Sequence, residues 1–275
     1  MSKTSDFPYL HGFTETEQER LRSQAEFAEY NIFQNINFST SKNVLEVGCG
    51  VGAQTEILLR RFPKTHVTGV DLNEKQLDAA KKFLNSKNEF KGRYDFQLMS
   101  GADLKFGPNT FDGAYLCWIL EHVPNPAQVL SEVRRVLRPG SEIVVTEVMN
   151  SSFFLDPYSP NVWKYWMAFN DYQYDHAGDP FVGAKLGNLL TQVGYQQVRT
   201  EVKTWHFDNR QPAQRKQAIH YWTDLLLSAA DQLVKEKYVD AEVVAKTKEE
   251  LDKVSNDPNA VFLYSFMQAK ALVYF

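Results

Sequence analysis

Three closely spaced glycines follow an apolar segment in the first quarter of the chain. Residues 44–52 read VLEVGCGVG, so Gly48, Gly50 and Gly52 form a turn between a predicted strand and a predicted helix. Glycine permits positive φ and lets a ligand approach the main chain, while the N–H groups of the helix start favour a polar or anionic group. The segment therefore predicts a ligand-binding turn.

An acidic residue ends the next predicted strand. Asp71 closes VTGVD, roughly 20 residues after the glycine turn, where a carboxylate can accept hydrogen bonds from a ribose diol. Spaced glycines alone are weak evidence, because ordinary tight turns also contain them. Together with Asp71 they predict a nucleoside-binding site.

Histidine is the side chain best suited to remove a proton near neutral pH. His122, in Leu-Glu-His-Val, follows a predicted strand, at the carboxyl end of the sheet, where open α/β sheets bind ligands. His176 has Asp175 beside it in an aromatic segment. A hydrogen bond to its own loop, or plain surface exposure, explains either histidine as well. His122 is therefore a candidate general base and His176 a candidate substrate contact.

Nine aromatic residues crowd the segment from Phe153 to Tyr174. Aromatic side chains combine a large apolar area with polar groups, which suits a pocket for an organic substrate. Packing of a cap helix on the core explains most of them equally well. We expect only Tyr158, Trp163 and Trp166 to face a ligand.

Apolar runs alternate with amphipathic stretches between residues 43 and 148. This rhythm predicts βα units on a mostly parallel sheet. The predicted strands cover 43–47, 66–70, 94–99, 111–117 and 142–148, and the predicted helices cover 53–62, 74–87 and 126–137. Pro126 at the start of the third helix and Pro139-Gly140 after its end make its bounds the best defined.

Further elements are predicted on both sides of this core. Thr14 and Glu17 form a capping box that opens a helix over 14–37. After the core we expect a helix at 182–193, a strand at 196–204, two long helices within 212–255 and a strand at 261–275.

In this order the motifs resemble the class I S-adenosylmethionine-dependent methyltransferases. The run Glu46-Val-Gly48-Cys-Gly50-Val-Gly52 is similar to the E/D-x-G-x-G-x-G loop of that family, and Asp71 to the acidic residue that ends its second strand. The segment FDGAYLCWILEHVPNP and the later RRVLRPGSEIVVTE resemble the family's fourth strand, helix and fifth strand. The resemblance is close over about residues 40–150 and weak over 178–198.

The resemblance implies a doubly wound, seven-stranded, mostly parallel α/β sheet of Rossmann-like fold, S-adenosylmethionine as cofactor and a small organic molecule as methyl acceptor. It implies that the glycine backbone approaches the methionyl and ribose parts and that Glu46 helps to fix the amino group. It further implies that Asp71 binds the ribose hydroxyls, Leu72 packs on adenine and Asp103 reaches the exocyclic nitrogen.

Four segments follow from this interpretation. Residues 1–39 would form an N-terminal lid helix, and 40–204 the cofactor-binding core, with an aromatic cap insertion near 150–178. Residues 205–260 would be a helical insertion and 261–275 the last core strand. The lid would bring Gln24 to the cofactor and Tyr9, Phe13, Leu21 and Phe27 to cofactor or substrate. The apolar stripe WTDLLLSAADQLV completes the cap or forms a homodimer face.

The composition of the chain argues against some classes of binding partner and favours one cellular location. The formal charge is −4 and no block of like charges occurs, which argues against nucleic acid. No long apolar run or secretory signal is found, so a cytoplasmic protein without membrane contact is expected. Two cysteines are too few for a disulfide framework or an all-cysteine metal site, and no metal-ligand spacing stands out.

Two alternatives stay open at this point. A nicotinamide-binding domain also fits Gly48-x-Gly50-x-x-Ala53, although Glu46 and Asp103 have no role in that scheme. A catalytically silent binder of S-adenosylmethionine, or this fold recruited for another reaction, belongs to a different class of function. Oxygen, nitrogen, sulfur and carbon acceptors are all compatible with the motifs.

Overall fold

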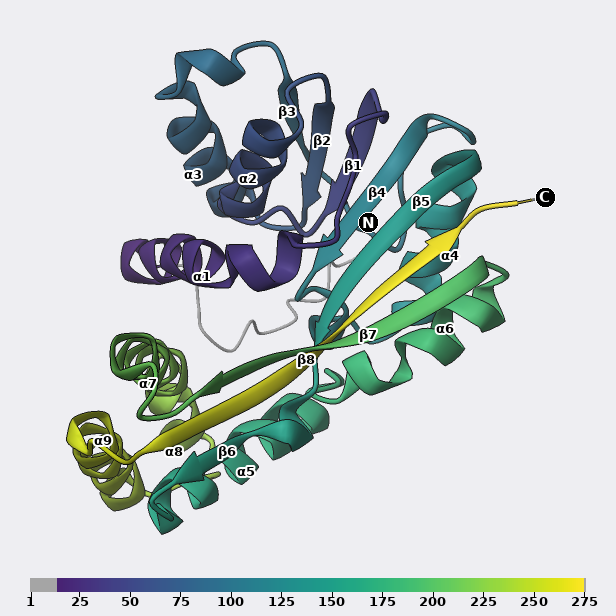
Figure 1. Cartoon of the computed structure of the whole chain (residues 1–275). Coiled ribbons are helices and arrows are strands. Elements are labelled where there is room, and N and C mark those ends of the chain that lie inside the picture. The colour runs from purple at the N-terminus through teal and green to yellow at the C-terminus, as the bar shows by residue number, and fades with distance from the viewer. Residues whose placement is uncertain (1–13, 275) are drawn as a thin grey trace.

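A computed structural model describes residues 14–274 of the chain. Its centre is a mixed sheet of eight strands in the order β3-β2-β1-β4-β5-β8, with β6 and β7 both paired to β8 (Figure 1). The parallel strands are β1 (Asn43–Val47), β2 (His66–Asp71), β3 (Tyr94–Leu98), β4 (Phe111–Cys117) and β5 (Leu137–Val148). The doubly wound α/β fold predicted from the sequence is confirmed.

The sheet changes direction between β1 and β4. From β1 the chain proceeds outward to β2 and β3, and then returns to place β4 and β5 on the other side of β1. Ligands of open α/β sheets bind in the crevice at the carboxyl ends of the strands at such a point. A ligand-binding site is therefore expected at the carboxyl ends of β1 and β4.

Helices cover both faces of the parallel half, and side chains cap the starts of three of them, α1 as predicted. Side chains of Thr14, Asn73 and Asn125 accept hydrogen bonds from the first turns of α1, α3 and α4. The helices are α1 (Glu15–Phe33), α2 (Ala53–Arg61), α3 (Glu74–Asn85), α4 (Pro126–Val136) and α6 (Leu186–Val193). Short 3₁₀ helices lie at Asn88–Phe90, Leu120–His122, Asn150–Ser152 and Val182–Lys185.

The antiparallel strands β7 (Gln196–Phe207) and β8 (Val261–Leu272) form a long hairpin that extends beyond the parallel strands (Figure 1). One half of β8 pairs with β5, and its first residues pair with the short strand β6 (Phe154–Asp156). The predicted seven strands are thus joined by an eighth, β6, which the sequence analysis assigned to the aromatic cap.

The protruding half of the hairpin carries a helical cap. It consists of α5 (Pro160–Asp175), α7 (Pro212–Leu227), α8 (Ala230–Lys235) and α9 (Ala241–Asn256). The two long helices predicted within 212–255 are α7 and α9, and the short α8 lies between them. The chain leaves the helical conformation after α7 and again at Lys237, where φ is 65°.

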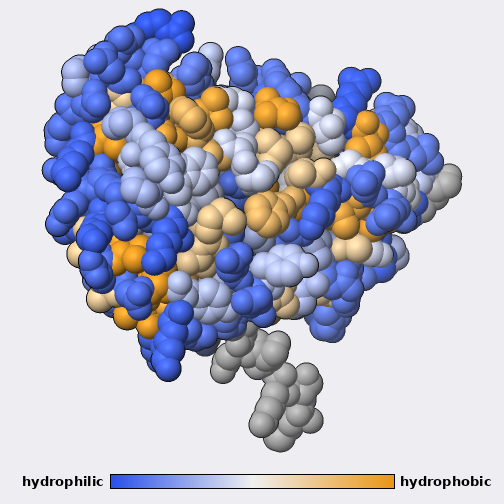
Figure 2. All heavy atoms as spheres, turned by 90° about the horizontal axis from the view of Figure 1, so that it is seen from below, coloured by the Kyte–Doolittle hydropathy of each residue, from blue (hydrophilic) through white to orange (hydrophobic). Residues whose placement is uncertain are grey.

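The apolar stripe of α7 and α8 packs inside the chain. Trp222, Leu226 and Leu233 are all buried in the cap, so the stripe completes the cap, which is one of its two predicted roles. Figure 2, which views the molecule from below the orientation of Figure 1, shows hydrophilic residues around the edge and more hydrophobic ones toward the middle. Among the described residues, no helix is long and apolar enough to cross a membrane.

Candidate active site

A cavity of about 290 Å³ lies at the carboxyl ends of β1, β2, β4 and β5, near the lower end of the range for small-molecule sites. Its walls come from the turns after these strands, from α1, and from the cap elements α5, α7, β7 and β8. The predicted strand-end location is therefore where the structure has a cavity.

The glycine turn forms part of the cavity wall. Gly48 and Gly50 line it, with φ of 74° and 48°, and Gly52 caps α2 with φ of 74° without lining it. A Cβ at Gly48 would lie 2.8 Å from the side chain of Ile119, whereas a Cβ at Gly50 would meet nothing within 4 Å. Gly48 thus permits a close approach of two turns, and Gly50 leaves its main chain open.

Asp71 lies beside this turn and lines the same cavity. Its two carboxylate oxygens accept hydrogen bonds from the backbone N–H groups of Gly50 and Asn73, each at 2.9 Å. Burial raises the pKa of Asp71 from its ordinary value. Each oxygen retains a lone pair for a further donor. Leu72, also at the cavity, is 66% exposed although it is apolar.

Glu46 and Asp103 do not line the cavity. The Glu46 carboxylate is buried and accepts a hydrogen bond of 2.5 Å from Thr55 Oγ1, and burial raises its pKa to about 8. Asp103 is exposed and pairs with Lys105. The roles that the resemblance gives these two acids stay predictions.

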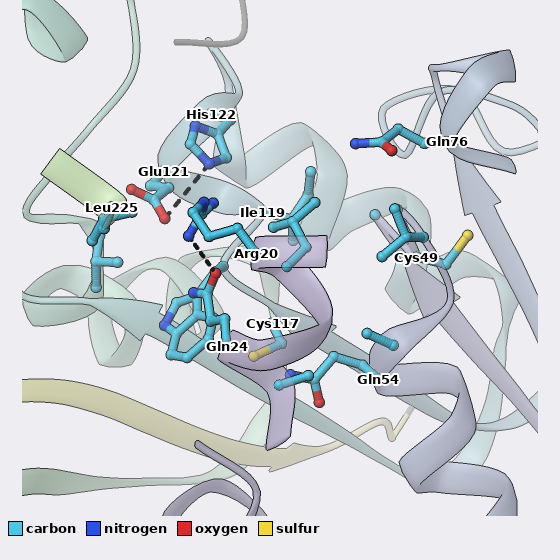
Figure 3. A pocket seen from close by; sticks show the side chains of 18 of the residues that line it. Arg20, Gln24, Cys49, Gln54, Gln76, Cys117, Ile119, Glu121, His122 and Leu225 are labelled. Carbon is cyan, nitrogen blue, oxygen red and sulfur yellow. Dashed lines mark hydrogen bonds and ion pairs between the residues drawn. The ribbon is translucent and has the colours of Figure 1, made fainter. Parts of the chain in front are cut away.

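His122 and Glu121 face each other at the turn after β4 (Figure 3). His122 Nε2 lies 3.6 Å from Glu121 Oε1, and Gln173 Nε2 donates to Glu121 Oε2 at 2.8 Å. All three residues line the cavity. His122 was predicted to be a site residue and Glu121 was not, although the two are adjacent in Leu-Glu-His-Val.

A second buried carboxylate holds this turn in place. Glu147 Oε1 accepts hydrogen bonds from the backbone N–H groups of Ile119 at 3.0 Å and Leu120 at 2.7 Å. Burial, and then the nearby Glu121, raise the pKa of Glu147 well above its usual range. Glu147 was not predicted to be part of the site, because it lies within an otherwise apolar predicted strand.

Helix α1 contributes the residues that close one side of the cavity. Arg20, Leu21, Gln24 and Ala25 line it, and Arg20 is bound by both Glu17 carboxylate oxygens, at 2.7 and 2.6 Å, and by Gln24 Oε1 at 3.1 Å. Gln24 and Leu21 were predicted to reach the site, and Arg20 was not.

The remaining predicted contacts on the N-terminal segment lie elsewhere. Phe27 packs against Trp205 and Tyr221, with ring centroids 5.0 and 5.4 Å away, and does not line the cavity. Tyr9 and Phe13 lie outside the described residues.

Aromatic rings build the cap side of the cavity. Trp166, which was predicted there, is joined by residues that local sequence did not single out: Trp118, Phe169, Trp205, Tyr221, Trp222 and Tyr264. They come from α5, β7, α7, β8 and the turn after β4, so no single segment marks them as a group.

Tyr158, Trp163 and His176, which were predicted to face a ligand, lie away from this cavity, and their contact with a ligand stays a prediction. Tyr158 is 74% exposed, and Trp163 packs on Phe153 with ring centroids 5.4 Å apart. His176 stacks on Tyr172 at 4.1 Å and lies 3.4 Å from a Glu236 oxygen. None of the three lines the cavity. Across residues 14–274 there is also no group of three or more His, Cys, Asp or Glu suited to a metal ion.

Comparison with known proteins agrees with the class of site. Residues 45–145 match a family model described as a methyltransferase domain. An O-methyltransferase of Penicillium expansum is 32% identical over 158 residues, which cover 57% of this chain and 53% of that protein. The chain spans about half the length of the curated relatives it matches.

Solved structures share the fold at low sequence identity. A phosphoethanolamine N-methyltransferase of Haemonchus contortus superposes with a TM-score of 0.61 at 15% identity, covering 100% of this chain and 62% of that one. The cyclase SpnF gives 0.51 at 18% identity, covering 93% and 82%. Residues 45–145 therefore match a methyltransferase domain, in agreement with the resemblance, and the solved structures share the fold.

The buried Glu46 carboxyl predicts a pH effect on stability. Its pKa rises from 4.5 to about 8 on folding, so between these values the unfolded chain is ionised while the folded chain keeps the proton. Stability contributed by this group is therefore lost as pH rises toward 8. We therefore compare the free energy of unfolding of Glu46→Gln with that of the wild type, by urea unfolding at pH 5 and at pH 8. The difference between the two proteins should change by roughly 2–4 kcal/mol in favour of Glu46→Gln over this range.

The exposed carboxylate of Glu249 on α9 gives the control. Glu249→Gln should follow the wild-type pH profile. If the free energies of unfolding of Glu46→Gln and wild type differ by the same amount at pH 5 and at pH 8, burial does not raise the pKa of Glu46.

Proposed function

We propose that this protein is an S-adenosylmethionine-dependent methyltransferase that acts on a small organic molecule. The observation that carries this proposal is that Gly50 and Asp71 are hydrogen-bonded to each other on the wall of the same cavity that holds His122. A candidate nucleoside contact and a candidate base thus line one cavity. The methyltransferase family match supports the proposal.

The residues at the strand ends fit the proposed cofactor. The main chain at Gly50 is open to the cavity, Asp71 has lone pairs for the ribose hydroxyls, and Leu72 exposes an apolar surface for adenine. The cofactor supplies an electrophilic methyl group on a positively charged sulfur. Glu46 would act on the amino group from outside the wall, and Asp103 would have to leave Lys105 to reach adenine.

The chain's contribution to the reaction is position and proton removal. In-line methyl transfer needs the acceptor held near van der Waals contact with the methyl group and water excluded. His122 would take the proton of a hydroxyl or amine acceptor, and Glu121, 3.6 Å away, would stabilise the imidazolium that results. No further catalytic group is required for an acceptor that is already ionised.

Only the first half of helix α1 would act as a lid. Arg20 and Gln24 line the cavity, whereas Ile32 and Phe33 are buried in the core and Ile32 accepts a hydrogen bond from Gln268 at 2.9 Å. The second half is therefore anchored, and opening would occur at the N-terminal turns. We place the enzyme in the cytoplasm with a small-molecule partner, in line with its charge of −4.

Cofactor binding is the first prediction. Calorimetry should show that the protein binds S-adenosylmethionine and its demethylated product with micromolar affinity, about −8 kcal/mol. Asp71→Ala should weaken both by about 1.5–3 kcal/mol, because hydrogen bonds to a charged group contribute roughly that much. Asp78→Ala, on the exposed face of α3, is the control. Tighter binding of a nicotinamide cofactor than of either compound would overturn the proposal.

A transfer assay separates an enzyme from a silent binder. Labelled S-adenosylmethionine is incubated with the protein and a metabolite extract, and label is scored in extractable products. Binding without any transferred label would support the alternative of a silent binder or a different reaction.

The second prediction concerns the base. His122→Gln should lower the turnover number by about 10²–10⁴-fold with a hydroxyl acceptor while leaving cofactor affinity nearly unchanged. The readout is the pH dependence of turnover together with cofactor binding. A loss smaller than threefold would return His122 to a structural role.

The third prediction concerns the lid. Amide hydrogen exchange in residues 15–25 should slow at least severalfold when S-adenosylhomocysteine is added, because a ligand beneath Arg20 and Gln24 holds these turns closed. Exchange in the anchored residues 28–33 is the internal control. Equal exchange in residues 15–25 with and without the ligand would make α1 a fixed wall.

A further inference from the structure

The cavity has two ends of different chemistry, which Figure 3 shows side by side. Cys49 and Gln76 lie at one end, near the strand-end turns, whereas Arg20, Glu121, His122 and Leu225 gather at the other. Ile119 and Cys117 lie between them. The first end includes Asp71 and the open glycine turn and is the proposed cofactor end. The second is free for another molecule.

The walls of the second end are rings that hold one another in place. The centroids of Trp222 and Tyr264 are 4.6 Å apart, those of Trp166 and Trp222 5.2 Å, and those of Trp205 and Tyr221 6.0 Å. Trp205 and Trp222 are each 1% exposed. Rings packed in this way form a rigid slot, and a rigid slot loses little conformational entropy when it binds a flat ligand.

Polar atoms in this wall lack partners among the described residues. The indole N–H groups of Trp118, Trp205 and Trp222 are buried and donate to no acceptor, whereas that of Trp166 donates to the carbonyl oxygen of Asn150 at 3.1 Å. Gln173 Oε1 is buried and accepts no hydrogen bond. These four atoms have almost no accessible surface, so the wall that the rings present to a ligand is mainly apolar.

We propose that this aromatic end binds a flat, oxygenated ring compound, an aryl or polycyclic alcohol, with the reacting hydroxyl at His122. This inference rests on the proposed methyltransferase function. In the reaction the acceptor's O–H bond breaks and its proton goes to His122. The acceptor oxygen forms a bond to the methyl carbon while the carbon–sulfur bond breaks and its electron pair stays with sulfur.

Charge at this end disfavours a phosphorylated acceptor. The Arg20 guanidinium lies on the wall, but it is already bound by both carboxylate oxygens of Glu17 and by Gln24. Glu121 also lies close to it in Figure 3. The wall therefore offers little surplus positive charge to a phosphate, and a neutral ring alcohol fits this constraint.

Leu225 offers a way to block the slot without touching the cofactor end. It lies on α7 beside Glu121 and is partly buried. Leu225→Trp fills the slot, and Asp224→Trp places the same side chain on the exposed face of the same helix one residue earlier. The probe is 2-naphthol, titrated calorimetrically into protein saturated with S-adenosylhomocysteine, with phosphoethanolamine as the comparison probe.

We expect saturable binding of 2-naphthol and none of phosphoethanolamine. Leu225→Trp should weaken 2-naphthol binding at least tenfold and leave S-adenosylhomocysteine binding within twofold, and Asp224→Trp should change neither. If Leu225→Trp does not fold, Leu225→Ala removes one wall of the slot and should weaken 2-naphthol binding at least threefold.

Three results would overturn the inference in distinguishable ways. Binding of phosphoethanolamine without 2-naphthol, in protein that binds S-adenosylhomocysteine, refutes the ring-alcohol acceptor and leaves the methyltransferase proposal intact. Unchanged 2-naphthol affinity in both Leu225 variants places the probe elsewhere and refutes the slot. Failure of S-adenosylhomocysteine to bind the wild type refutes the proposed function and the inference with it.

Discussion

The close approach of Gly48 to Ile119 is the contact on which the cavity depends. It lies where the sheet changes direction, so the turn after β1 and the turn after β4 meet there. A side chain at residue 48 would lie 2.8 Å from Ile119 and would push the two turns apart. Because Gly48 also has φ of 74°, an L side chain there would be strained in any case.

The buried carboxylate of Glu147 stabilises the second of these turns. It accepts hydrogen bonds from Ile119 and Leu120, the two residues that precede Glu121 and His122. Backbone N–H groups beyond the end of a strand have no partner in the neighbouring strand, and the Glu147 carboxylate accepts their hydrogen bonds instead. The backbone of the turn that carries His122 is therefore held by β5, two strands away from the glycine turn.

The local parts of the site were predictable from the sequence, and the assembled parts were not. Gly48, Gly50 and Asp71 occur in short segments whose strand, turn and helix signals agree with one another, so their meeting follows from parallel strand geometry. Trp205, Tyr221 and Tyr264 reach the cavity only through the β7–β8 hairpin and its helical insertion, and no local pattern shows how far that hairpin protrudes.

The different positions of the predicted aromatic residues have a physical cause. Helix α5 buries Val162, Tyr165, Trp166 and Phe169, a spacing of three and four residues that defines one face. Trp163 lies beside that face, and Tyr158 precedes the helix and is exposed. Ring type alone does not assign the helical face, so the prediction included Trp166, which lines the cavity, together with two residues that do not.

Buried polar groups without a partner are a cost that the rest of the fold must offset. Such groups are nearly always hydrogen-bonded, because an unpaired one costs about 1–3 kcal/mol. Among the described residues, Gln76, Trp118, Gln173, Trp205 and Trp222 have such atoms and line the cavity, whereas those of Arg93, Arg215 and Gln268 lie elsewhere. The aromatic packing around the cavity helps to offset this cost. A ligand that binds only the folded cavity should add to the stability of the cap, because binding shifts the folding equilibrium.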